Sequence, residues 1–208
     1  MLTDLSVRDF SSQLADKVPV PGGGGAAALA GGLAAALGSM AAKYTVGKKA
    51  YEDYEGDLNE MIKTCGELRL KLLALVEKDA EAFEPLSKAY KLSKDDPDRD
   101  EILENATLEA AYVPLDIMDA CADVIDVLDE LVEKCSRLMI SDVACAAILA
   151  GAALKAASIN VFVNTSSMNN RMKAEELELT ADRLLEDYIP LSEVISETVT
   201  ADLREGTD

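Results

Sequence analysis

An acidic side chain interrupts an otherwise apolar helix face in the segment 51–92. The apolar positions recur every three or four residues, which is the spacing of one face of an α-helix; they are Leu68, Leu72, Leu75, Phe83 and Leu86. Asp79 occupies the remaining position of that face. A carboxylate among apolar side chains is costly unless it is paired or faces a cavity. Asp79 is therefore a candidate acid–base catalyst, and a structural ion pair or a contact at a helix junction is the alternative.

A glycine-rich segment near the N-terminus is the second candidate site. Pro19-Val20-Pro21 is followed by four consecutive glycines, Gly22 to Gly25, and then by a helix made mostly of Ala and Gly. Free N–H groups in the first turn of a helix favour anionic ligands, and glycine lets the backbone approach a ligand closely. The spacing matches neither a Walker loop nor a dinucleotide fingerprint. A flexible turn before a tightly packed helix is the alternative.

Two amide side chains lie on one face of a second small-residue helix. Asn160 and Asn164 are four residues apart, near the end of an Ala-rich stretch that follows Ser141 and Asp142, and side chains at that spacing are neighbours on a helix. Buried amides need hydrogen-bond partners, which a heterocyclic ligand would provide. Hydrogen bonding in the core or across a subunit interface is the alternative. For Asp142 the alternative is an acid in the first helical turn, stabilised by the helix dipole.

A local basic cluster stands out from the acidic composition. Lys43, Lys48 and Lys49 lie where the glycine-led helix is expected to end, although the chain has 39 acidic and 20 basic side chains and a net charge of −19. The cluster is a candidate site for the anionic tail of a ligand, and a favourable interaction with the helix C-terminus is the alternative. The overall charge argues against nucleic acid as a partner, because phosphate binding needs a basic surface.

The composition narrows the chemistry further. The chain has no histidine, which removes the commonest general base and the commonest zinc ligand. A catalytic acid or base must then be a carboxylate, Lys, Tyr or Cys, and we expect no metal. The four cysteines form no C-x-x-C pair and no signal peptide is recognisable, which favours the cytoplasm. The uncharged run 22–42 is rich in Gly and Ala rather than Leu, so we expect a buried helix and no membrane span.

The elements that must position these residues are all helical. The patterns predict helices over about residues 3–18, 25–46, 51–92, 97–112, 114–135, 142–165 and 173–203. Pro114 should begin or kink the fifth of these helices, and Pro190 should kink the last. No strand-like alternation competes with this pattern. We therefore predict an all-α fold, a single-domain bundle of six or seven helices over residues 1–208, closely packed through small residues.

Taken together, these motifs resemble the cyclodeaminase/cyclohydrolase family, which includes the cyclodeaminase domain of formiminotransferase-cyclodeaminase and free-standing bacterial methenyltetrahydrofolate cyclohydrolases. The similarity covers nearly the whole chain. It rests on the order and spacing of short motifs, which are 19–24 (PVPGGG), 45–49 (TVGKK), 79–83 (DAEAF), 113–115 (VPL), 141–142 (SD) and 160–164 (NVFVN). Two positions depart from the family pattern. Gly25 stands where Ser is common, and Lys48 and Lys49 stand where some relatives have two Arg, which weakens bidentate carboxylate binding.

The resemblance implies an all-helical homodimer that acts on one-carbon derivatives of tetrahydrofolate, and that Asp79 is the acid–base residue. We expect no tightly bound cofactor. We further expect the remaining candidates to bind substrate; these are Pro21, Gly22, Gly23, Gly24, Lys48, Lys49, Asp142, Asn160 and Asn164. In this scheme the two lysines would bind a glutamyl or polyglutamyl tail.

Two reactions fit this resemblance. The expected one is hydrolysis of 5,10-methenyltetrahydrofolate to 10-formyltetrahydrofolate, because the chain shows no formiminotransferase domain. The first alternative is cyclodeamination, in which 5-formiminotetrahydrofolate yields the methenyl compound and ammonia. The second alternative is a helical dimer that binds folate without turnover. In both reactions a carboxylate in apolar surroundings can take a proton from the nucleophile and return one to the leaving nitrogen.

Overall fold

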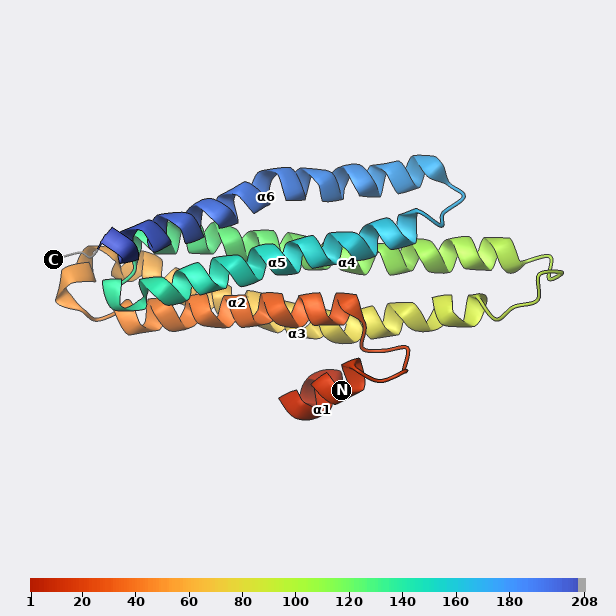
Figure 1. Ribbon diagram of the computed structural model, residues 1–208, viewed down its shortest axis with the longest axis horizontal. Helices are drawn as coiled ribbons and strands as arrows, with labels where there is room; N and C mark the ends of the chain where they lie inside the picture. Colours follow the sequence, from red (N-terminus) through yellow and green to blue (C-terminus); the bar gives the residue numbers. More distant parts are fainter. Residues whose placement is uncertain (206–208) are drawn as a thin grey trace.

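The all-α prediction is confirmed. The computed structural model describes residues 1–205, in which six α-helices and three short 3-10 helices occur and no β-strand is found. Five long helices form an elongated up-and-down bundle, and the short helix α1 lies outside it (Figure 1). In chain order the elements are η1 (Leu2–Asp4), α1 (Val7–Leu14), α2 (Gly23–Thr45), η2 (Lys49–Tyr54), α3 (Glu55–Ala89), α4 (Arg99–Lys134), η3 (Arg137–Met139), α5 (Ile140–Thr165) and α6 (Arg171–Glu205).

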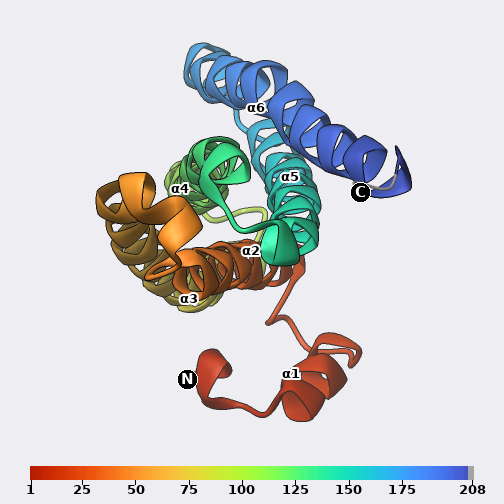
Figure 2. The same cartoon turned by 90° about the vertical axis from the view of Figure 1, so that its left-hand side faces the viewer.

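The order of packing decides which helix ends meet. Helix α4 packs against each of the other four long helices, and α2 also packs against α3 and α5. Figure 1 shows that α2 runs antiparallel to both α3 and α5, and Figure 2 shows the same helices along the bundle. The first turn of α2 therefore lies beside the last turns of α5, while the last turn of α2 lies at the opposite end of the molecule.

Small residues allow α2 to approach its neighbours closely. A Cβ atom added at Gly31 would lie 2.8 Å from the Cys121 sulfur, and one added at Gly38 would lie 3.1 Å from Leu128 Cδ2. Both partners are on α4, so the glycines remove atoms that would push the two helices apart. Close packing through small residues, which the composition predicted, is thus observed between these helices.

Proline residues lie inside three of the helices, at positions 85, 114 and 190. The prediction of separate helices on the two sides of Pro114 is wrong, because α4 continues through it. Proline removes the N–H that would bond the carbonyl four residues earlier, here that of Ala110. That carbonyl instead accepts a hydrogen bond from Asn164 Nδ2 at 2.9 Å, so the helix continues without an orphaned acceptor. Helix α6, which contains Pro190, changes direction along its length (Figure 1).

The N-terminal segment is a separate arm rather than the single helix expected over 3–18. Ser6 caps α1, because its hydroxyl accepts a hydrogen bond from the Asp9 N–H at 3.1 Å. Thr3 anchors η1 to the bundle: its N–H donates to Glu77 Oε1 of α3 at 2.8 Å. Figure 2 shows the arm below α2 and α3, joined to the bundle at the first turn of α2. The arm therefore lies at the same end of α2 as the glycines.

Two helical segments, Gly23–Thr45 and Arg137–Thr165, are long and apolar enough to cross a membrane, and 61% and 50% of their apolar windows are buried inside the bundle. The remainder faces outward. Both of these adjacent helices carry exposed apolar side chains. We call the set the α2–α5 face; its members are Leu33, Tyr44, Ile148, Ile159 and Val163. An open apolar groove of about 700 Å³ between α5 and α6 adjoins this face at Ile159. These surfaces are partner-binding candidates, because large exposed apolar patches are uncommon on monomers.

Candidate functional site

A cleft of about 230 Å³ lies where α2 begins and α5 ends. It brings together candidates that are distant in the sequence: the N-cap glycine and two further glycines of α2, Asp79 of α3, and both asparagines of α5. The full lining is Pro19, Val20, Gly22, Gly23, Gly24, Asp79, Ala82, Phe83, Ala110, Asn160, Val163 and Asn164. Pro21 is buried directly beneath, with its Cβ 3.6 Å from a Cβ built on Gly25. One wall is thus backbone, and the facing walls carry a carboxylate and two amides.

The consecutive glycines form the first turn of α2 rather than the loop that the sequence suggested. Gly22 is the N-cap residue, with extended backbone, and Gly23 to Gly25 are helical. The Ala26 N–H is the first to bond within the helix, to the Gly22 carbonyl at 3.0 Å. The N–H groups of the three helical glycines therefore have no partner within α2 and are available to side chains or a ligand.

Asp79 packs directly on this glycine turn. Its Oδ2 accepts a hydrogen bond from the Gly25 N–H at 2.8 Å. A Cβ on Gly24 would overlap Asp79 Oδ1, so only glycine fits at position 24 while the carboxylate keeps this position. The glycine turn therefore orients the carboxylate and allows it to lie against the backbone.

The surroundings of Asp79 favour its protonated form. Burial among apolar side chains raises the pKa of the Asp79 carboxyl, and the hydrogen bond from the Gly25 N–H lowers it by less. Within residues 1–205, the structure gives Oδ1 no hydrogen-bond partner, and Asp79 lines the cleft. A half-buried carboxylate with one fixed and one open oxygen, and with a raised pKa, is suited to take up a proton and release it again. No described residue forms an ion pair with it, so the structural alternative of a salt bridge is not observed.

The two asparagines are held in different ways. Asn160 Nδ2 donates to the Ala156 carbonyl of its own helix at 2.9 Å, and its Oδ1 would lie 3.4 Å from a Cβ on Gly23. Asn164 Nδ2 donates to the Ala110 carbonyl of α4 at 2.9 Å. In both cases the donor group is engaged with a protein carbonyl, and the amide oxygen remains for a ligand donor.

The structure does not bring Lys48, Lys49 or Asp142 into this cleft. Helix α2 has 23 residues, so its two ends are about 33 Å apart at 1.5 Å per residue. Lys48 Nζ donates to Ser136 Oγ at 2.9 Å at the far end of the bundle. Asp142 lies there too, because its charge and that of Lys48 both act on the Cys135 thiol. Burial raises the pKa of this thiol, the charge of Lys48 lowers it, and the charge of Asp142 raises it.

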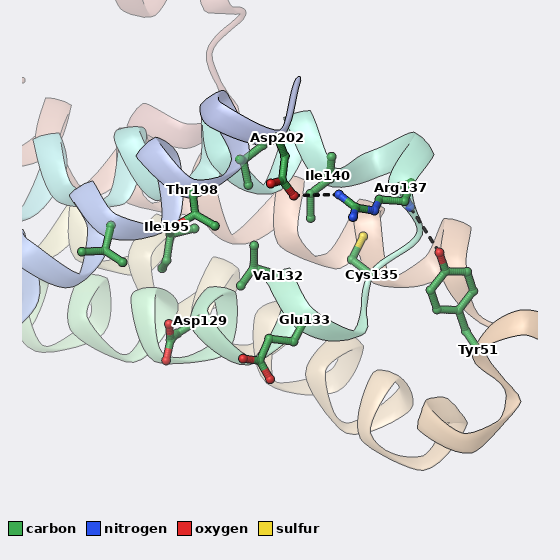
Figure 3. Close-up of a pocket in the computed structure, with 12 residues that line it drawn as sticks. Tyr51, Asp129, Val132, Glu133, Cys135, Arg137, Ile140, Ile195, Thr198 and Asp202 are labelled. Atoms are coloured by element: carbon green, nitrogen blue, oxygen red, sulfur yellow. Dashed lines mark hydrogen bonds and ion pairs between the residues drawn. The ribbon is translucent and has the colours of Figure 1, made fainter. Parts of the chain in front are cut away.

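A larger cleft of about 460 Å³ lies at that far end (Figure 3). Two of its four charged side chains, Arg137 and Asp202, form an ion pair with each other. Arg137 Nη1 is 2.7 Å from Asp202 Oδ2, and the Arg137 N–H donates to the Tyr51 hydroxyl at 3.3 Å. Figure 3 shows the Asp129 and Glu133 carboxylates on the opposite wall, pointing away from this pair. The smaller cleft is therefore the candidate functional site, because it is lined by a carboxylate oxygen and two amide oxygens that have no hydrogen-bond partner among residues 1–205.

Sequence reasoning missed several residues of the smaller cleft. Phe83 was assigned to the apolar helix face, although a position four residues after Asp79 lies beside it on the helix. Val163 and the backbone carbonyl of Ala110 carry no chemical signal in the sequence. No group of three or more His, Cys, Asp or Glu side chains suited to a metal ion occurs within the part of the chain that the structure describes.

Comparisons with known proteins show the family to which the chain belongs. The profile of the formiminotransferase-cyclodeaminase family matches residues 6–183. The chain belongs to this family. Among its relatives is a protein named methenyltetrahydrofolate cyclohydrolase from Methylorubrum extorquens, 37% identical over 198 residues, which are 93% of this chain and 95% of the relative.

Other family members match with lower identity or as part of a larger protein. Formimidoyltransferase-cyclodeaminase from Mus musculus is 28% identical over 190 residues, which are 89% of this chain but 35% of the mouse protein. The fold is that of the formiminotetrahydrofolate cyclodeaminase structure from Thermotoga maritima, with a TM-score of 0.85 and 32% identity, covering 96% of this chain and all of that one. Membership of the family is thus supported by sequence and by fold over nearly the whole chain.

Proposed function

We propose that this chain is a methenyltetrahydrofolate cyclohydrolase, which adds water to 5,10-methenyltetrahydrofolate and releases 10-formyltetrahydrofolate. The observation that carries the proposal is the position of Asp79: a half-buried carboxylate in a cleft, oriented by the Gly25 N–H, with its pKa raised by burial. The cyclohydrolase name of the Methylorubrum extorquens relative, which aligns over 95% of its own length, supports the choice of this reaction.

In the proposed mechanism, Asp79 acts first as a base and then as an acid. Water attacks the methenyl carbon as Asp79 Oδ1 removes one of its protons, which gives a neutral tetrahedral intermediate. The bond from this carbon to N5 then breaks as Asp79 returns the proton to N5. The remaining hydroxyl proton leaves to solvent as the formyl C=O forms on N10, so one H⁺ is released per turnover. The Gly25 N–H holds the carboxylate throughout, and the raised pKa favours the proton uptake that the first step requires.

Cyclodeamination of 5-formiminotetrahydrofolate is the second candidate. The similar Thermotoga maritima structure carries that name, and the same carboxylate could deprotonate N10 and protonate the departing ammonia. The two substrates differ at the one-carbon group, and both proceed through a tetrahedral carbon. A direct comparison of the two reactions is therefore the decisive measurement.

The test is a spectrophotometric assay of methenyltetrahydrofolate loss and formation, with each substrate supplied separately. We expect loss of the methenyl compound with the wild-type protein and a fall in kcat of roughly 10²–10⁴-fold for Asp79→Asn, the range of general acid–base catalysis. Asp119→Asn is the matched control, because Asp119 is a second carboxylate whose pKa burial raises, and it lies outside the cleft. It should retain activity within twofold.

Three results would change the assignment. Turnover of the formimino substrate alone would establish the cyclodeaminase. Folate binding without turnover of either substrate would favour the non-catalytic dimer. Near-normal activity of Asp79→Asn, with Asp119→Asn also active, would remove Asp79 from its catalytic role.

We further propose that the protein is a cytoplasmic homodimer, with the α2–α5 face of one subunit packed on that of the other. Its apolar side chains span both helices, and a stable interface needs about 800 Å² from each partner. An antiparallel two-fold arrangement would place the end of α2 that carries Lys48 and Lys49 beside the glycine turn of the partner. Because about 33 Å separates the two ends within one chain, such a dimer would let the lysines reach the tail of a monoglutamyl folate bound in the partner's cleft.

A further inference from the structure

The helix-interior proline of α4 acts on the candidate site from outside it. Pro114 is buried and lies within Arg99–Lys134, and it is absent from the lining of the cleft. Its missing N–H leaves the Ala110 carbonyl without its usual partner in the helix. That carbonyl belongs to a residue that does line the cleft.

A side chain from another helix replaces the missing N–H as the hydrogen-bond donor to this carbonyl. Asn164 Nδ2 donates to the Ala110 carbonyl at 2.9 Å, across 54 residues of sequence. Because a carbonyl only accepts, the amide nitrogen of Asn164 must face it, and the amide oxygen must face the other way. Within residues 1–205, Asn164 Oδ1 has no hydrogen-bond partner, and Asn164 lines the cleft with Asp79.

The other prolines and the other asparagine lack this arrangement. Pro85 and Pro190 also lie inside helices, and the described side chains donate no hydrogen bond to the carbonyls four residues before them, those of Glu81 and Glu186. Asn160 bonds to a carbonyl of its own helix, at Ala156, which the helix already uses. Among the residues described, Pro114 is the only helix-interior proline whose freed carbonyl accepts a hydrogen bond from a side chain that lines the cleft.

We propose that Pro114 is a positioning residue. Because it has no N–H, it leaves the Ala110 carbonyl free to accept the hydrogen bond from Asn164 Nδ2. This hydrogen bond turns the Asn164 oxygen toward the cleft, where the oxygen accepts a hydrogen bond from a ligand N–H. The ligand class is a heterocycle with N–H donors, and in this respect the inference rests on the proposed folate substrate. The effect is on binding rather than on the proton transfer, because Pro114 does not line the cleft and acts through Asn164, which would accept a hydrogen bond from the ligand.

The kinetic test replaces the proline by a residue that restores the N–H. In Pro114→Ala the Ala110 carbonyl regains a helical partner, so Asn164 Nδ2 must share this carbonyl with a backbone N–H and is held less firmly. We expect KM for 5,10-methenyltetrahydrofolate to rise about fivefold with kcat within twofold, since a net hydrogen bond corresponds to about this factor. Asn164→Ala should do the same, and the double variant should be no worse than Asn164→Ala alone. Pro190→Ala is the matched control: it restores the same kind of bond in α6, and its KM should be unchanged.

A second measurement separates this inference from the proposed reaction. In wild type and in Pro190→Ala, the side-chain NH₂ of Asn164 should exchange slowly with solvent by NMR, and in Pro114→Ala it should exchange faster by at least tenfold. This readout needs no turnover, so it remains informative if the proposed substrate is wrong. If Pro114→Ala does not fold, Asn164→Asp takes its place, because it keeps the shape, lacks the donor and should raise KM as Asn164→Ala does.

Several results would overturn the inference. One is a KM for folded Pro114→Ala within twofold of wild type, and another is unchanged protection of the Asn164 amide in that variant. Independent, multiplicative effects of Pro114→Ala and Asn164→Ala on KM would show that the proline acts by another route. A normal KM for Asn164→Asp would show that the donated hydrogen bond is unimportant.

Discussion

Gly24 and Asp79 are in such close contact that a change at one must move the other. In Gly24→Ala the new methyl group would overlap Asp79 Oδ1 and force the carboxylate away from the Gly25 N–H. We expect kcat/KM to fall at least tenfold and the free energy of unfolding to fall by about 1–3 kcal/mol, the usual cost of overpacking. Steady-state kinetics and urea denaturation measure the two effects.

The control for this variant is Gly56→Ala. Nothing lies within 4 Å of a Cβ at Gly56, which is in the first turn of α3, so the same substitution there should leave activity unchanged. A fully active Gly24→Ala protein would contradict the close packing of the carboxylate on the glycine turn.

The raised pKa of Asp79 has a cost in stability that depends on pH. Between the pKa of Asp79 in the unfolded chain and its higher value in the fold, the folded state binds more protons, so stability decreases as pH rises through this window. Asn at this position stays neutral, and its Oδ1 can still accept the Gly25 N–H. We expect Asp79→Asn to unfold at a higher urea concentration than wild type at pH 7, and the difference to shrink as pH falls toward the ordinary Asp pKa of about 3.9. Equal midpoints at pH 7 would contradict this.

At the scale of helices, the close packing of α2 on its neighbours depends on glycines, which have no side chain. A Cβ at Gly31 would lie 2.8 Å from the Cys121 sulfur and 3.2 Å from Leu72 Cδ2. Overpacking costs about 1–3 kcal/mol, whereas alanine gains about 1 kcal/mol over glycine in helix propensity. We therefore expect Gly31→Ala to lower the free energy of unfolding by about 1 kcal/mol net, measured by urea denaturation.

For Gly66→Ala, on a neighbouring helix, we expect the opposite change in the free energy of unfolding. Gly66 lies inside α3 with nothing within 4 Å of a Cβ, so only helix propensity changes. This variant should gain up to ~1 kcal/mol. If both variants gained stability equally, α2 would not be held at contact distance from α4.

The helices and the central residues of the cleft could be predicted from local patterns, whereas contacts between helices could not. The unusual position of Asp79 could be predicted because sequence spacing alone determines which residues share one face of a helix. Asn160 and Asn164 were paired for the same reason. The continuation of α4 through Pro114 depends on a donor 54 residues away from Ala110, which no local rule for proline contains. The separation of Lys48 from Asp79 likewise depends on the length and direction of α2.

At the scale of the whole molecule, the α2–α5 face predicts association. Ile148 is 57% exposed on α5 and lies outside the cleft, so Ile148→Asp should convert a dimer to a monomer in sedimentation velocity while the helical content stays the same. Ile102→Asp is the control, because Ile102 is exposed on α4, away from this face. A monomeric wild type that instead binds lipid vesicles would show that a membrane covers the face.

Mixed dimers test whether the lysines act across the interface. One subunit carries Asp79→Asn and the other carries Lys48→Ala with Lys49→Ala. If each site takes Asp79 from one subunit and the lysines from its partner, one site in the mixed dimer is intact, and it should show the wild-type KM with half the wild-type kcat. If the lysines act within their own subunit, the mixed dimer should show the raised KM of the dimer in which both subunits carry Lys48→Ala with Lys49→Ala. If that dimer has the wild-type KM, the lysines do not bind the substrate.

The hydrogen bond from the Gly25 N–H to Asp79 also makes the backbone a reporter of the site. The amide is 2.8 Å from the carboxylate, so its chemical shift should follow the charge of Asp79, and the resonance belongs to glycine, whose amides occupy their own region of a ¹⁵N–¹H spectrum. A titration followed at this one signal would give the protonation state of the carboxylate directly, in the free protein and with folate bound, without any label or substitution in the site.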